Sequence, residues 1–190
     1  MSWQIDPQHS HIQFSVRHMM ISTVRGKFRD YTGTVDFDEE NPQQTDVYVR
    51  INAASIDTQT EDRDNHLRSP DFLHVEEYPY ITYQSKRIEL IDERNARLIG
   101  DLTIRGETRE VPVDVTYQGR SQSPWGDIRV GFTGEASFSR KDWNLTWNQA
   151  LETGGWLVGD KITVDIELQL VKQDVEEAQE QIAEALAAAD

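Results

Sequence analysis

SHIQFSVRH, residues 10–18, alternates between polar and apolar side chains at almost every position. Ile12, Phe14 and Val16 share one face of this stretch, and polar residues occupy the other. A period of two is typical of a β-strand with one buried face. His18 lies on the same face as the apolar row and ends it with a polar ring. This pattern suits a strand that lines a cavity with a wet mouth, so we expect the apolar row to face a shared interior.

The same alternation recurs along the chain until about Val171. About eight strands, most of them apolar on one side, favour an antiparallel barrel or sandwich over a parallel sheet. We therefore predict an all-β fold. Besides residues 10–18, the strand-like segments are 33–37, 47–51, 78–91, 97–104, 111–117, 128–138 and 162–170.

Two segments break the strand pattern. Thr58-Gln-Thr-Glu61 fits a capping box and predicts a short helix that runs through Leu67. In the last segment, residues 174–190, apolar residues recur at helical spacing among Glu, Gln and Ala. We predict two parts: a barrel over residues 1–173 and an acidic amphipathic C-terminal helix or tail over residues 174–190.

Composition narrows the possible partners. The 190 residues carry 34 acidic and 19 basic side chains, a formal net charge of −15. This balance argues against nucleic-acid binding and disfavours electrostatic docking on an anionic membrane. No apolar run approaches the roughly 20 residues of a transmembrane helix, so we expect no integral membrane segment. The first residues lack the pattern of a secretory signal, so we expect a cytoplasmic protein, or a periplasmic one if a leader has been removed.

Motifs of catalysis and of metal binding are weak. The chain has no cysteine, no G-x-S-x-G sequence, no P-loop and no dinucleotide fingerprint. His9 and His11 would point the same way on a strand, but they have no matched acidic ligand nearby, and we predict no metal site. His18 and His66 remain candidates for an acid or base in an enzyme acting on a small apolar or prenyl substrate.

Aromatic side chains are numerous, with five Trp, six Tyr and six Phe. Trp143 and Trp147 lie four residues apart in the sequence KDWNLTWN. Rings placed near the mouth of a barrel can grip an elongated apolar ligand. Their other reading is as ordinary core residues, and the sequence leaves both open.

Five separated motifs follow one another along the chain: WQIDPQHSHIQFSVRHMMISTVRGKF, AASIDT, RDNHLRSPDFLHVEEYPYITY, GDLTIRGETREV and LVGDKITVDIELQL. In this order they resemble the motifs of the YceI-like family, bacterial polyisoprenoid-binding proteins with a lipocalin-like barrel. The resemblance covers roughly residues 2–171 and excludes the acidic tail. Family members often have an aromatic residue followed by Gly where this chain has Trp143 and Asn144, and we expect the turn to survive because Asn accepts a positive φ.

The resemblance implies a non-enzymatic carrier or sequestering protein that holds an isoprenoid lipid, such as a quinone precursor or a polyprenyl phosphate, in an apolar channel. It requires no cofactor. Family resemblance and the amphipathic tail together suggest a homodimer. At the mouth of the channel we expect Arg63, His66 and His18 to contact the head group. The channel wall is predicted to contain Phe14, Val16, Phe28, Phe37, Val49, Ile51, Phe72, Leu102, Ile104, Val113, Val115, Val130, Phe132, Phe138, Trp143, Trp147, Ile162, Val164 and Ile166.

A third reading is an interaction module that uses the barrel as a scaffold and docks through the acidic tail. Alternation cannot distinguish a filled barrel from a hollow one, so the shape of the interior decides among these hypotheses.

Overall fold

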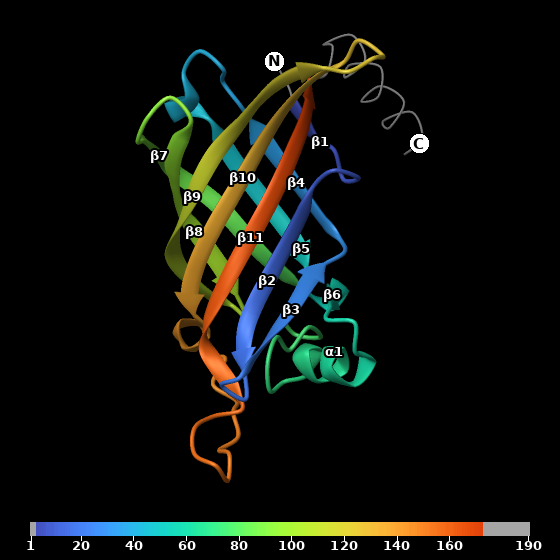
Figure 1. The fold of residues 1–190 in the computed structure, drawn as a ribbon, viewed down its shortest axis with the longest axis vertical. Coiled ribbons are helices and arrows are strands. Elements are labelled where there is room, and N and C mark those ends of the chain that lie inside the picture. Colours follow the sequence, from blue (N-terminus) through green and yellow to red (C-terminus); the bar gives the residue numbers. More distant parts are fainter. Residues whose placement is uncertain (1–2, 173–190) are drawn as a thin grey trace.

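Every strand pair in the computed structural model is antiparallel, and the strands form one sheet that closes on itself (Figure 1). The structure describes residues 3–172. The strands are β1 (Trp3–Ile5), β2 (His11–His18), β3 (Ser22–Phe28), β4 (Tyr31–Asp36), β5 (Asp46–Asn52), β6 (Ile56–Asp57), β7 (Tyr80–Leu90), β8 (Asn95–Ile104), β9 (Glu107–Gln122), β10 (Ile128–Ser139) and β11 (Val158–Lys172). The helical elements are η1 (Pro42–Gln44), η2 (Ala53–Ser55), α1 (Glu61–Arg68) and η3 (Arg140–Trp143).

The six short strands combine in pairs into three interrupted barrel strands: β1 with β2, β3 with β4, and β5 with β6. β1 and β2 both pair with β11, β4 then pairs with β1, and β3 pairs with β2. β5 follows on β4, and β6 follows on β3. These three composite strands and β7 to β11 make an eight-stranded antiparallel barrel. For residues 3–172 the predicted antiparallel barrel is thereby confirmed, with one short α-helix in this part of the chain.

The structure contains three strands that the alternation did not reveal: β1, β3 and the two-residue β6. β3 escapes notice because Gly26 replaces a large side chain on its inward face. A Cβ atom at Gly26 would lie 2.4 Å from Cζ of Phe14 on the neighbouring strand. The glycine therefore makes room for the Phe14 ring, and the same substitution hides the strand from a pattern of apolar residues.

The predicted helix exists, but its start differs from the capping-box prediction. α1 begins at Glu61, and its N-cap is Thr60, which makes no side-chain capping hydrogen bond. Thr58 instead donates from its backbone N (2.8 Å) and from Oγ1 (2.6 Å) to Oδ1 of the buried Asp64. The carboxylate inside the helix thus ties down the preceding loop, a role that a motif search on the first turn does not anticipate.

A smaller group of buried apolar side chains lies at the end of the barrel where β1 pairs with β11 and β4. Trp3, Val35, Val130 and Leu170 form a buried cluster there, and Val130 and Leu170 are almost completely inaccessible. Nε1 of Trp3 donates a hydrogen bond to the backbone O of Phe37 (3.0 Å). A larger cluster surrounds the rest of the interior, where the cavity lies.

The predicted C-terminal helix, residues 174–190, lies outside the described residues. Within residues 3–172, α1 and the short helical turns fall far short of the length and apolar character that crossing a membrane requires.

Candidate functional site

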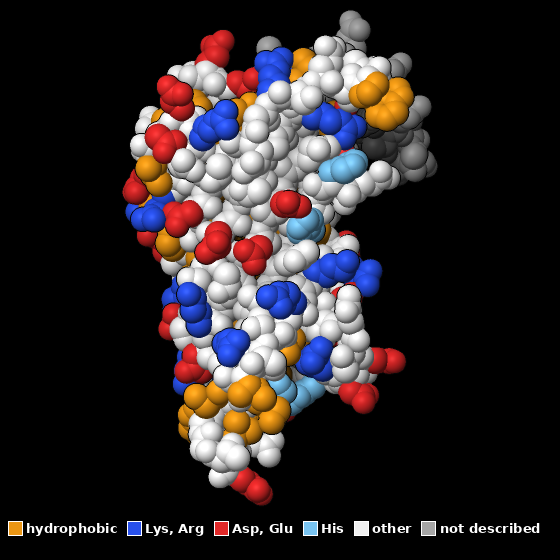
Figure 2. Space-filling model, viewed as in Figure 1, with side chains coloured by type: hydrophobic (Ala, Val, Ile, Leu, Met, Phe, Trp, Pro, Cys, Tyr) orange, Lys and Arg blue, Asp and Glu red, His pale blue; other side chains and the backbone are white. Residues whose placement is uncertain are grey.

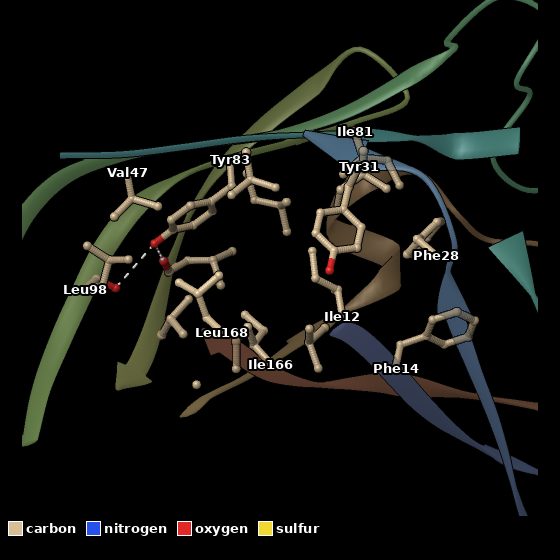
Figure 3. A pocket seen from close by; sticks show the side chains of 18 of the residues that line it. Ile12, Phe14, Phe28, Tyr31, Val47, Ile81, Tyr83, Leu98, Ile166 and Leu168 are labelled. Atoms are coloured by element: carbon tan, nitrogen blue, oxygen red, sulfur yellow. Dashed lines mark hydrogen bonds between the residues drawn. The ribbon is translucent and has the colours of Figure 1, made fainter. Parts of the chain in front are cut away.

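The barrel encloses a cavity of about 370 Å³ whose walls are almost entirely apolar. This size falls in the range of roughly 300–1,000 Å³ seen for ligand pockets. Figure 3 shows side chains of β2 and β11 facing those of β4, β5, β7 and β8 across the space. The arrangement follows from the period of two, since alternate residues of each strand point inward.

The row that opened the sequence analysis faces this interior. Ile12, Phe14 and Val16 all line the cavity, as their alternation predicts. Most of the predicted wall lies beside them. The cavity-lining residues among the candidates are Phe14, Val16, Phe28, Phe37, Val49, Ile51, Phe72, Leu102, Ile104, Val113, Val115, Phe132, Phe138, Ile162, Val164 and Ile166.

Three predicted wall residues pack elsewhere. Trp143 is 1% exposed, and its Nε1 donates to the backbone O of Leu102 (3.1 Å), so it packs behind the wall. Val130 belongs to the buried cluster that it forms with Trp3, Val35 and Leu170. Trp147 packs against the rings of His66 and Phe72, with centroid separations of 4.6 and 5.3 Å. These side chains are absent from the cavity lining that the described residues form.

The three predicted head-group residues also lie outside that lining. Arg63 donates from Nε to Oγ1 of Thr58 (2.7 Å) and from Nη2 to its backbone O (2.9 Å), and thereby holds the start of α1. His66 pairs with Asp71 at 2.8 Å. His18 is half-buried at the end of β2, opposite Val158, which itself lines the cavity.

Two tyrosines outside the predicted set, Tyr31 and Tyr83, bring hydroxyl groups to the cavity lining. Tyr31 donates its hydroxyl to the backbone O of Ser10 (2.7 Å). The Tyr83 hydroxyl lies 3.1 Å from the backbone O of Val111 and 3.3 Å from that of Leu98 (Figure 3). Burial raises the pKa of both phenols, and the charges of Asp101 and Glu110 raise that of Tyr83 further. Both hydroxyls therefore stay protonated and bonded to the protein itself.

Arg140 is a buried cation at the far end of the cavity wall, and it is 2% exposed. Its guanidinium contacts the backbone O atoms of Leu145, Trp147 (2.9 Å) and Gly159 (2.9 Å). Two longer contacts of 3.5 Å reach the O of Val158 and a carboxylate oxygen of Asp160. Burial lowers its pKa, and the charge of Asp160 opposes that effect.

These contacts use the full donor set of an arginine, so Arg140 anchors the loop between η3 and β11. The period of two predicts that Arg140 points inward, because it follows Ala136 and Phe138, whose side chains face the interior from β10.

The described polar groups do not converge on one point of the cavity. The two histidines considered as metal ligands each have a separate carboxylate: His9 pairs with Asp6 at 2.8 Å, and His11 with Glu167 at 3.2 Å. In the part of the chain that the structure describes, no group of three or more His, Cys, Asp or Glu side chains is arranged to hold a metal ion. What the cavity offers is a shaped apolar surface.

Comparison with known proteins places this barrel among relatives. The model of the YceI-like domain matches residues 3–170. A UPF0312 protein of Staphylococcus epidermidis is 38% identical over 161 residues, which cover 84% of this chain and 91% of the relative. Protein YceI of Escherichia coli O17:K52:H18 is 39% identical over 138 residues, or 73% of this chain and 72% of that protein.

Solved structures agree on the architecture. The YceI protein of Campylobacter jejuni superposes with a TM-score of 0.71 at 30% identity, over 83% of this chain and 90% of that one. BcnA of Burkholderia cenocepacia gives 0.77 at 22% identity, over 87% and 99%. A polyisoprenoid binding domain from Saccharophagus degradans gives 0.67 at 13% identity, over 90% and 98%. The last two support the fold alone. With the family model matched along the whole barrel, the chain belongs to the YceI-like domain family.

Proposed function

We propose that this protein binds an isoprenoid lipid in the barrel cavity and acts as its carrier or sequestering protein. The observation that carries the proposal is the apolar lining, in which the tyrosine hydroxyls are already bonded to backbone carbonyls. An apolar ligand forms no hydrogen bonds, so its binding leaves the two tyrosine hydroxyls with the backbone partners that they already have. The similarity of the fold to a domain described as polyisoprenoid binding supports the same ligand class.

The energetics of such a ligand suit the cavity. Burying one CH₂ group is worth about 0.8 kcal/mol, so a five-carbon isoprene unit contributes roughly 4 kcal/mol before ordering costs. Two or three units therefore suffice for tight binding, and specificity rests on the length and width of the channel. The scattered polar groups favour this reading over the enzyme hypothesis, which needs an acid and a base beside the same ligand atoms.

The test is organic extraction of the purified protein followed by mass spectrometry. We expect a prenyl lipid from the wild-type chain. Val164→Trp places a large ring in the cavity and should reduce recovery severely. Asp165→Trp is the matched control, because residue 165 is the next position on β11 and is exposed. Thermal unfolding checks that both variants fold.

Two results would defeat the proposal: protein that carries no prenyl lipid and takes none up when it is offered, or equal recovery from the two variants. The identity of the lipid, the homodimer and the cellular compartment stay predictions.

A further inference from the structure

Four large apolar side chains are exposed together at the end of the barrel opposite β1. Met19, Met20 and Ile21 form the turn between β2 and β3 and are 43%, 62% and 78% exposed. Trp156, 59% exposed, lies in the loop between η3 and β11. We call these four residues the apolar tip. Figure 2 shows hydrophobic side chains gathered at the lower end of the molecule, where Figure 1 places these two loops.

The two loops form one surface. The backbone N of Met19 donates to the O of Leu157 (2.8 Å). Sδ of Met20 packs so closely on Gly155 that a Cβ atom there would lie 2.1 Å from the sulfur. The guanidinium of Arg140 fixes the same loop from inside the barrel. The exposed side chains are therefore presented by an ordered backbone.

The turn holds Met19 and Met20 in a left-handed backbone conformation that methionine rarely adopts. Met19 and Met20 have φ values of 50° and 63°, and the N of Ile21 donates to the O of His18 (3.2 Å). Asn-Gly is the favoured pair for a two-residue hairpin turn with two positive φ angles, since larger side chains are strained there. Strain of this kind at an exposed apolar position points to a function for the side chains.

A cationic band adjoins the tip. Arg17, Arg25 and Lys161 are exposed on β2, β3 and β11, and none of the three has a carboxylate within ion-pair distance among residues 3–172. Arg17 donates instead to Oγ1 of Thr23 and to the backbone O of Met20. Figure 2 shows several separate Lys and Arg side chains above the orange patch.

The acidic side chains have a different distribution. At the tip end, Asp160 is paired with Lys141 at 2.8 Å, while Glu152 lies on the outer loop. The connections at the opposite end, β4–β5 and β7–β8, carry runs of acidic residues: Asp38, Glu39, Glu40, Asp92 and Glu93. Glu61 and Asp62 on α1 and Asp142 on η3 are also exposed at the tip end, so the cationic band occupies only the β2, β3 and β11 side of it.

We propose that the apolar tip inserts into the interfacial layer of an anionic lipid bilayer, with the cationic band against the acidic head groups. Trp and long apolar side chains on an exposed turn are suited to that layer, and neighbouring Lys and Arg add attraction to anionic lipid. His18 and Val158 connect the tip to the cavity wall, so docking brings one end of the cavity to the membrane surface. This inference concerns an outer surface and goes beyond ligand binding inside the barrel.

The experiment is cosedimentation of the full-length protein with vesicles of phosphatidylcholine, with and without phosphatidylglycerol, at low and high salt. We expect binding to the mixed vesicles that weakens at high salt and without the anionic lipid. Trp156→Ser and the double variant Met19→Asn with Met20→Gly should each weaken binding about tenfold or more. The double variant installs the preferred turn sequence, so its melting temperature should stay equal or rise.

Trp125→Ser is the matched control, because Trp125 is 85% exposed on the β9–β10 turn at the other end. Failure of the wild-type protein to bind any of these vesicles would overturn the proposal, as would equal binding by the tip variants and Trp125→Ser. Organic extraction of the same variants measures the lipid held inside the barrel, independently of vesicle binding. Loss of vesicle binding with normal lipid content in the tip variants would leave the proposed function untouched. Wild-type protein that binds vesicles but neither carries nor takes up a prenyl lipid would reject that function alone.

Discussion

Replacing Arg140 by Met tests how the loop between η3 and β11 is held. The guanidinium contacts four backbone carbonyls and the carboxylate of Asp160, and the side chain is 2% exposed. Methionine matches its length but donates nothing, so several buried carbonyls lose their partners. Leaving one buried acceptor unpaired costs about 1–3 kcal/mol. Because some of these carbonyls regain water, we expect a loss of about 3–5 kcal/mol in the free energy of unfolding.

In a domain of this size, each kcal/mol corresponds to roughly 2–4 °C in melting temperature. Arg140→Met should therefore melt roughly 6–20 °C below the wild type, and urea unfolding should give the free-energy loss directly. Lys141→Met is the control, since Lys141 is 52% exposed and makes one ion pair with Asp160, worth less than about 1 kcal/mol. Equal stabilities of the two variants would refute the anchoring role of Arg140.

Three further outcomes follow from single contacts. Because burial raises the pKa of Tyr83, the folded state keeps a proton that the unfolded state releases, so the free energy of unfolding should fall above about pH 10. Urea titrations of Tyr83→Phe should show a smaller fall. Gly26→Ala drives a Cβ atom into the Phe14 ring and should cost about 1–3 kcal/mol, part of which the added change Phe14→Ala restores in a double-mutant cycle. Asn144 has φ of 59°, so Asn144→Ala should lower stability by about 1 kcal/mol while Asn144→Gly should not, as measured by thermal melts.

The regular parts of this fold were predictable because alternation is a local signal. Residues 10–18 and 162–170 each contain their whole inward row, and that row alone indicates which side chains face the interior. The φ of Asn144 was foreseeable in the same way, because a residue tolerant of positive φ stands where family members often have Gly. The helical insertion was foreseeable too, although the hydrogen bonds of Asp64 displaced its start.

The remaining features depend on partners far away in the sequence. Val130 and Phe132 lie two residues apart on β10, so both side chains point inward. Val130 is nevertheless fully buried in the cluster with Trp3, whereas Phe132 lines the cavity. The difference arises because β1 closes the barrel over Val130, and three residues are too few to reveal β1 in a pattern. Trp143 was predicted to line the channel as one of two rings four residues apart near the mouth, but its hydrogen bond to the O of Leu102 on another strand holds it behind the wall.

β11 has a consequence for how the barrel assembles. Among the described strands it alone pairs with three others, β10 on one side and β1 and β2 on the other. Its contacts with β1 join residues such as Trp3 and Lys172, at opposite extremes of the described chain. Pairings between such distant residues slow folding. During synthesis, the apolar interior therefore stays open to water until the last strand emerges. We therefore expect the nascent chain to be prone to aggregation until β11 has emerged.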